Sequence, residues 1–133
     1  MRNTTSVVLA FATLCLAGCG GDDLEYTLWE ADMSTVQWGP AGNAVVRPNN
    51  YWRVEFGPDH SYRETAVLGG QASHPEGTYE ITSHEGDQYT VHVTAAVEQF
   101  DLQIRGRTLY YSRESAAGTI TATMPCDPRM CID

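Results

Sequence analysis

Apolar and polar residues alternate along nearly every segment of the chain from residue 51 onward. In the stretch YWRVEF (51–56), Trp52, Val54 and Phe56 share one face of an extended chain. A period of two is typical of a β-strand with one buried and one solvated face. No segment sustains the 3.6-residue period of an amphipathic helix. The pattern therefore predicts an all-β fold.

Turn signals separate these segments at short intervals. They are GPDH (57–60), GGQASHPEG (69–77), HEGD (84–87) and GR (106–107). Six strands are well marked between residues 51 and 124, and one or two more precede them, one of them a short strand at 44–47. Strands joined by short turns pair antiparallel, and closing such a meander into a barrel removes its exposed edges. We predict a small antiparallel up-and-down barrel of about eight strands over residues 24–133.

The N-terminal segment has a different character. Arg2 precedes a run of ten residues (7–16) that is apolar apart from Thr13. The run is about half as long as a bilayer-spanning helix but typical of a secretory signal peptide. The next residues, Leu16-Ala17-Gly18-Cys19, resemble the lipobox of bacterial lipoproteins at all four positions. In that family the chain is cut before the cysteine, whose thiol and new amino group are acylated. The resemblance implies a lipoprotein signal peptide at 1–18, a lipid such as palmitate on Cys19, and a lipidated flexible tether at 19–23.

Two other interpretations of this segment are a cleaved signal peptide without a lipid and a buried helix with two thiols. Cys15 is a poor anchor, because the bulky Leu14 would precede the cut. Gly20, directly after the anchor, resembles the sorting pattern for the outer membrane in enterobacteria. We therefore predict a lipid-anchored protein of the bacterial cell envelope, at the outer membrane. Its mature chain of 115 residues is enough for one domain.

The mature chain is strongly acidic. All seventeen acidic residues and seven of the eight basic residues follow the predicted cut, which gives a formal charge of −10. Such a surface repels phosphate backbones and anionic head groups, so nucleic acid is a poor partner. Membrane attachment then depends on the lipid, whereas a basic protein would be attracted.

The two remaining cysteines, Cys126 and Cys131, lie five residues apart near the C-terminus. An exported compartment is oxidising, so the pair predicts a disulfide, and Asp127-Pro128 can bend the chain between them. Free thiols and a metal site are the alternatives. The spacing is wider than C-x₂-C and no histidine lies near, which weakens the metal site. We expect the bond to fix a C-terminal turn and to contribute about 2 kcal/mol.

Three stretches of the sequence resemble small bacterial lipocalin-like domains. They are WRVEFGPDHSY (52–62), GTYEI (77–81) and FDLQIRGRTL (100–109), and the resemblance covers roughly residues 51–112. His60 stands where a turn glycine is usual in that family. The shared motifs mark strands and turns, so the resemblance implies a calycin-type barrel more than a function. Some of these domains bind apolar ligands.

No catalytic motif is present. The sequence lacks G-x-S-x-G, and lipidation and pairing leave no cysteine for nucleophilic work. The histidines fall in turns, in a loop or on a polar face: His60, His74, His84 and His92. A metal held by two of them at the surface is an alternative to solvation. We expect no enzymatic activity, no cofactor and no resident metal.

Large aromatic residues occupy inward positions of the predicted strands. They are Trp52, Phe56, Tyr79, Tyr89, Phe100 and Tyr111. An eight-stranded barrel has room for packed side chains or for one small ligand, so these residues either fill the core or line a cavity. One hypothesis is thus a lipocalin-like envelope lipoprotein that binds a small apolar or amphiphilic ligand. The other is an interaction module such as a periplasmic inhibitor of a basic hydrolase, since envelope lysozyme inhibitors are also small anchored barrels.

The Cys19→Ser variant tests the anchor. A hydroxyl is a far weaker nucleophile than a thiolate, so we expect the variant to take up no lipid and to remain uncut. The Cys15→Ser control loses its substitution with the signal peptide and should behave like the wild type. Metabolic labelling with a palmitate analogue and the mass of the mature chain measure both effects. Label that persists in Cys19→Ser but disappears in Cys15→Ser contradicts the assignment.

Overall fold

A computed structural model describes residues 23–38, 50–115 and 118–132. The predicted signal peptide, Cys19 and most of the tether lie outside the described residues, as does the strand expected at 44–47. The strands are β1 (Thr27–Glu30), β2 (Gln37–Trp38), β3 (Tyr51–Phe56), β4 (Ser61–Leu68), β5 (Gln71–Ser73), β6 (Glu76–Glu85), β7 (Gln88–Ala95), β8 (Glu98–Arg105), β9 (Thr108–Ser115) and β10 (Gly118–Pro125). The alternating stretches identified in the sequence are therefore strands.

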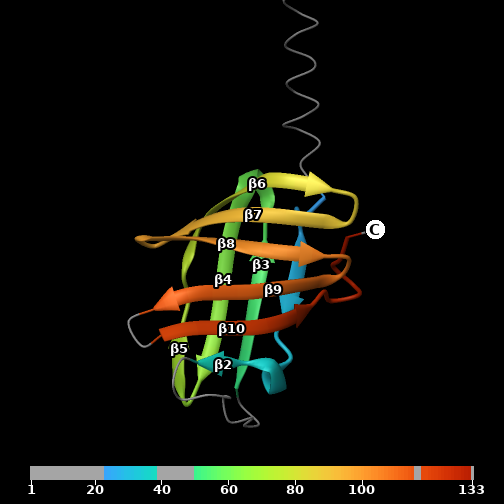
Figure 1. Ribbon diagram of the computed structural model, residues 1–133. Coiled ribbons are helices and arrows are strands. Elements are labelled where there is room, and N and C mark those ends of the chain that lie inside the picture. Colours follow the sequence, from blue (N-terminus) through green and yellow to red (C-terminus); the bar gives the residue numbers. More distant parts are fainter. Residues whose placement is uncertain (1–22, 39–49, 116–117, 133) are drawn as a thin grey trace, which may run out of the picture.

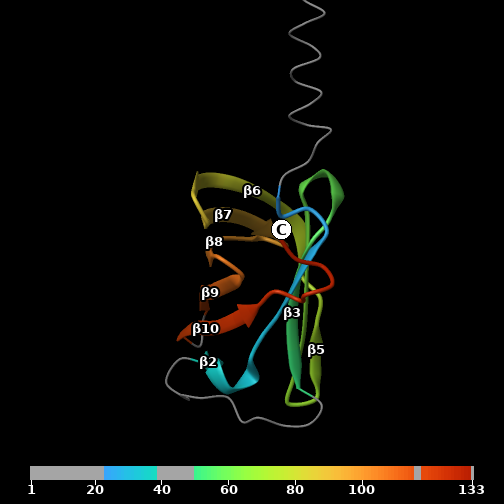
Figure 2. The same cartoon turned by 90° about the vertical axis from the view of Figure 1, so that its right-hand side faces the viewer.

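All ten strands belong to one antiparallel sheet. Their order is β1-β3-β4-β6-β7-β8-β9-β10-β2, and β5 pairs with β4. The sheet curls so that β3 and β4 cross the direction of β6 to β10 (Figures 1 and 2). This confirms the all-β antiparallel fold. The sheet has ten strands, where about eight were expected, and it curls into a half-barrel that is compatible with a barrel fold.

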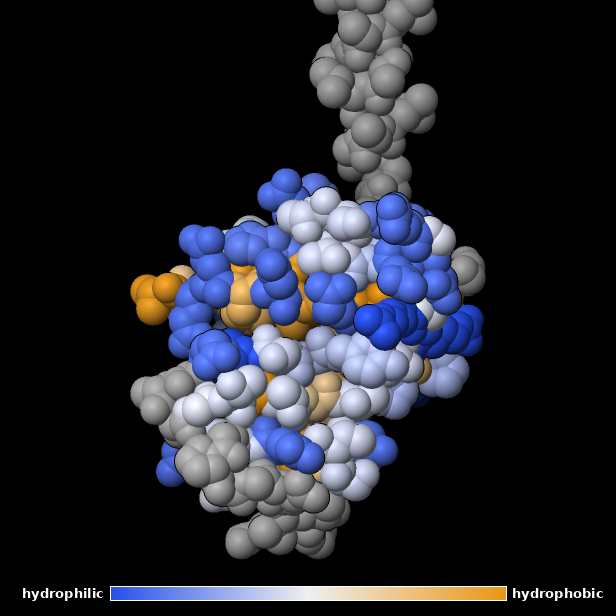
Figure 3. Space-filling model, in the orientation of Figure 1, coloured by the Kyte–Doolittle hydropathy of each residue, from blue (hydrophilic) through white to orange (hydrophobic). Residues whose placement is uncertain are grey.

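The core lies between the two halves of the curled sheet. One half consists of β1, β3, β4 and β5, and the other consists of β2 and β6–β10. Strand β3 alternates strictly, with Trp52, Val54 and Phe56 buried. At the tips of the β6–β7 and β8–β9 turns, Gly86 and Gly106 have φ angles of 59° and 60°, which glycine adopts without strain. The outer face of β6–β10 is largely hydrophilic, as the alternation requires (Figure 3).

Strand β1 joins the C-terminal segment to the rest of the sheet. It pairs with β3, and Trp29 forms an isolated antiparallel bridge with Cys126. The backbone N–H of Leu28 donates to the carbonyl of Met130 over 2.9 Å, and the N–H of Asp127 donates to the carbonyl of Leu28 over 2.8 Å. Strand β1 thus holds both β3 and the segment after β10.

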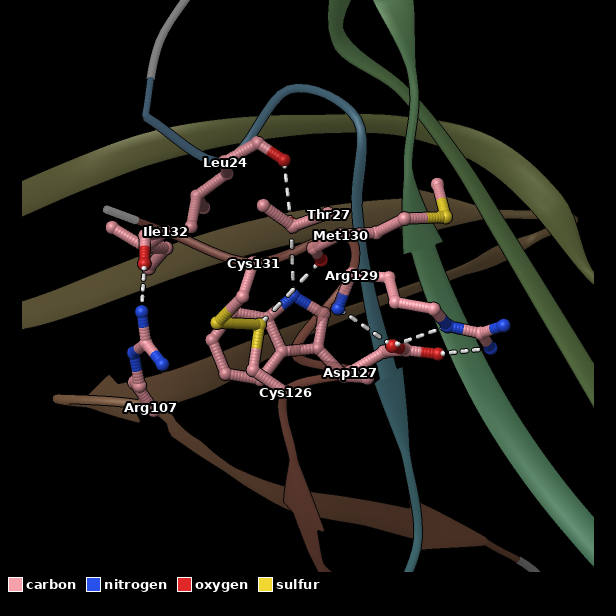
Figure 4. Close-up of a disulfide and its surroundings, with 10 residues drawn as sticks. Leu24, Thr27, Arg107, Cys126, Asp127, Arg129, Met130, Cys131 and Ile132 are labelled. Atoms are coloured by element: carbon pink, nitrogen blue, oxygen red, sulfur yellow. Dashed lines mark hydrogen bonds and ion pairs between the residues drawn. A yellow bond between two sulfur atoms is a disulfide. The ribbon is translucent and has the colours of Figure 1, made fainter.

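The predicted disulfide between Cys126 and Cys131 is present (Figure 4). It encloses Asp127 and Met130, the two residues whose backbones pair with Leu28. The Asp127 carboxylate also accepts hydrogen bonds from Arg129. The bond therefore shapes the loop that holds β1, and it does more than fix a terminal turn.

Replacing both Cys126 and Cys131 by serine should loosen this junction. We expect the free energy of unfolding to fall by about 2 kcal/mol, because the unfolded chain regains the freedom of the small loop. The Leu28 amide should exchange with solvent faster, since its acceptor is no longer held in place. Urea unfolding and hydrogen exchange measure the two effects. Reduced wild-type protein is the matched control, and an unchanged Leu28 amide contradicts the role given to the loop.

Candidate functional site

The six aromatic residues predicted to point inward are all buried, none more than 9 % exposed. The Trp52 and Tyr111 rings lie 4.6 Å apart between centroids, and the Phe56 and Tyr79 rings 4.7 Å. Phe100 packs on Tyr111 at 5.7 Å. Within the described part of the chain all six side chains belong to the hydrophobic core between the two halves of the sheet. Four of them, Phe56, Tyr79, Tyr89 and Phe100, also line grooves at the surface.

A carboxyl group that the sequence analysis did not single out lies inside this core. Glu64 is 2 % exposed. It accepts hydrogen bonds from Trp52 Nε1 over 3.0 Å, from Tyr62 Oη over 2.8 Å and from Tyr111 Oη over 3.0 Å. The signal was present in the sequence, because alternation along β4 places Glu64 on the same face as Tyr62 and Ala66. A charged residue in an inward register indicates a buried polar group.

The two tyrosines remain hydrogen-bond donors at every ordinary pH. Burial, together with the adjacent Glu64 carboxylate, raises the pKa of Tyr62 and Tyr111 well above the usual tyrosine value. The Arg113 guanidinium only partly offsets this rise in pKa. Every donor around Glu64 is thus engaged in binding the strands together, and this cluster leaves no reactive group exposed.

A groove of about 220 Å³ lies at the end of the half-barrel where the described chain begins, and we call it the tether-side groove. Its apolar parts include Tyr26 and Met130, which are 59 % and 41 % exposed. Arg63 and Glu76 form an ion pair at 3.8 Å on its rim. The full lining comprises Tyr26, Thr27, Glu55, Phe56, Gly57, Pro58, Ser61, Tyr62, Arg63, Glu76, Gly77 and Met130. An apolar surface with a few charged groups at its edge suits an amphiphilic ligand.

Strained backbone gathers beside this groove. Tyr26, Asp59 and His60 have φ angles of 66°, 55° and 59°, and such a conformation costs a residue other than glycine about 1 kcal/mol or more. Hydrogen bonds hold it in place: the Tyr26 N–H donates to the Phe56 carbonyl, and the Asp59 N–H donates to Glu25 Oε2. Strain that the surrounding structure maintains is typical of ligand sites. His60 adopts the conformation expected of the glycine it replaces.

The histidines do not converge on a metal. His84 stacks on Tyr89 with 4.0 Å between ring centroids, and His92 lies on the outer face between Asp101 and Gln99. Hydrogen bonds to Asp101 and Gln99 raise the pKa of His92. Within residues 23–38, 50–115 and 118–132, no group of three or more His, Cys, Asp or Glu side chains could hold a metal ion. No helix in the same residues is long and apolar enough to cross a membrane.

Comparisons with protein families, with curated proteins and with solved structures find no match to this chain.

Substitutions of Glu64 test its place in the core. Glu64→Leu leaves three buried donors without an acceptor, so we expect it to lower the free energy of unfolding by about 3–5 kcal/mol. Glu64→Gln keeps one acceptor and should cost clearly less. The exposed control Glu80→Gln should stay within about 0.5 kcal/mol of the wild type. Urea denaturation measures the free energy of unfolding of the three variants. A Glu64→Leu protein as stable as the wild type would contradict the structural role given to Glu64.

Proposed function

We propose that this chain is a lipid-anchored lipoprotein of the bacterial envelope whose non-enzymatic β domain binds a small amphiphile in the tether-side groove. The lipobox-like residues 16–19 support the anchor. The left-handed backbone of Tyr26, which lines the groove, supports the ligand site and is the observation that carries this part of the proposal.

The position of the groove suits a ligand drawn from a membrane. Asp23, where the described chain begins, lies four residues after Cys19. Four extended residues span at most about 14 Å. Tyr26 follows three residues later and lines the groove. A lipid on Cys19 therefore keeps the groove close to the bilayer surface, where amphiphiles are concentrated.

The chemistry of the groove sets the kind of ligand. Tyr26 and Met130 offer exposed apolar contacts, and the Arg63–Glu76 pair offers charges of both signs. A short apolar group with a polar head fits this arrangement, with the head at the rim and the apolar part over Tyr26 and Met130.

The proposal includes no catalysis. The buried carboxyl group of Glu64 is occupied by three donors and faces the core. At the surface, the carboxylate of Asp101 is held by His92, and that of Asp127 by Arg129. No cofactor is needed for binding of this kind.

Photo-crosslinking tests the ligand site in the mature lipoprotein, reconstituted in phosphatidylcholine nanodiscs. The probe is a short-chain lysophospholipid that carries a diazirine. We expect saturable labelling of peptides that contain Tyr26 or Met130. The double variant Tyr26→Ser/Met130→Ser should lose most of this labelling, because the apolar contacts are removed.

Val97→Ser is the matched control. Val97 is 98 % exposed at the β7–β8 turn, so it tests the loss of an exposed apolar side chain away from the groove. Its labelling should equal that of the wild type. Labelling that unlabelled lysophospholipid cannot compete away reflects contact with the bilayer and contradicts a binding site, as does equal labelling of the groove variant.

A further inference from the structure

Strands β8 and β9 are paired over only part of their length. The register joins Gln103 to Tyr110, Ile104 to Leu109 and Arg105 to Thr108. By contrast, β8 pairs with β7 along all eight of its residues, and β9 does so with β10. The two strands diverge away from their shared turn, as Figure 1 shows. We call the gap between residues 98–102 and 111–115 the β8–β9 seam.

The seam interrupts the hydrogen bonding of the sheet. Residues 98–102 and 111–115 keep the extended backbone of strands and are bonded on their outer sides. Alternate N–H and C=O groups on each strand therefore point into the seam without a partner from the facing strand. Backbone groups of this kind bind water or an added strand.

The seam is also a surface groove. It has a volume of about 420 Å³, and its lining includes Phe100, Ser112 and Arg113 together with the carboxylates of Glu98, Asp101 and Glu114. Asp101 and Glu114 lie on the exposed outer face of their strands. The groove is acidic because its lining holds three carboxylates and one guanidinium. A fourth carboxylate, that of Glu80 on the outer face of β6, lies nearby: Glu80 pairs in register with His92 on β7, and His92 pairs with Asp101 on β8.

Arg113 does not make the groove a site for anions. Its Nε lies 3.6 Å from the Glu98 carboxylate, and its guanidinium covers the rings of Phe100 and Tyr111 at 5.4 and 5.8 Å. The charge of Arg113 is thus matched by Glu98. Asp101 contacts His92 Nδ1 at 2.7 Å, and Glu114 accepts a hydrogen bond from Thr119 Oγ1 over 3.0 Å. With His92 neutral, the three carboxylates and one guanidinium leave the groove with a net negative charge.

We propose that an extended, basic segment of another protein binds in the β8–β9 seam. Its backbone pairs with the free edge of β8 or β9, which is the usual geometry of strand addition. Its lysine or arginine side chains meet Asp101 and Glu114. A second copy of this chain is disfavoured as the occupant, because it carries the same large negative charge.

The seam is separate from the tether-side groove and remains accessible in an anchored protein. The closed end of the seam is the turn at Gly106, where the Gly106 N–H donates to the Asp87 carbonyl. Gly106 and Asp23 line the same surface pocket, so this turn lies close to Asp23. The open end, at residues 98 and 115, lies at the opposite end of both strands from this turn. A partner can therefore reach the seam while the domain stays on the membrane.

The experiment uses the mature lipoprotein in phosphatidylcholine nanodiscs and three short fluorescent peptides. One alternates lysine with valine, the second is the same peptide N-methylated at alternate backbone amides, and the third alternates glutamate with valine. We expect the first to bind and the second to bind at least about tenfold more weakly, because it has lost main-chain donors. The third should not bind. In hydrogen exchange, the first peptide should protect amides within 98–102 or 111–115.

Matched variants locate the site. The double variant Asp101→Asn/Glu114→Gln should weaken binding of the lysine peptide about fivefold, since exposed charge pairs each contribute modestly. Glu85→Gln/Asp87→Asn removes the same charge at the β6–β7 turn and should bind like the wild type. Equal affinity of the N-methylated peptide, equal loss in both double variants, absence of protection in the seam, or failure of the lysine peptide to bind would each overturn the proposal.

Discussion

The hydrogen bonds to Glu64 hold the two halves of the half-barrel together. The donors are Trp52 on β3, Tyr62 on β4 and Tyr111 on β9, and they meet at one carboxyl group that solvent barely reaches. A buried carboxylate is tolerable only when such donors are in place, so this cluster fixes how the crossing strands face each other. It also places a satisfied polar group among the aromatic side chains of the core.

The tether-side groove depends on the same segments that join the C-terminal loop to the sheet. Met130 accepts the Leu28 N–H through its backbone carbonyl, and it also lines the groove. Tyr26 is tied to β3 through the Phe56 carbonyl. The disulfide keeps the Met130 loop in register with β1. Tyr26, near the start of the described chain, and Met130, near its end, thus both line the groove. The shape of the groove depends on the pairing of β1 with β3 on one side and with the C-terminal loop on the other.

Much of this fold could be predicted from the sequence, because alternation reports directly which face of a strand is buried. Strands β3, β4, β7, β8 and β10 obey that rule, and the aromatic residues chosen from it are all buried. The groove could not be predicted, since Tyr26 owes its positive φ to a bond with Phe56, thirty residues away. The partial pairing of β8 and β9 was equally hidden, because local alternation does not reveal whether two neighbouring strands stay in contact. The burial of Glu64 could have been predicted, because the alternation along β4 places this residue on the inward face.

An open strand edge exposes a protein to unwanted pairing, and the charges along the seam limit this. Asp101 and Glu114 flank the unpaired backbone, so two copies of the chain that approach edge to edge bring carboxylates together. The same repulsion is absent for a basic segment, which gains both the backbone pairing and the opposite charge. The acidic composition of the chain thus has a local consequence. It keeps the seam closed to copies of itself and open to a cationic partner.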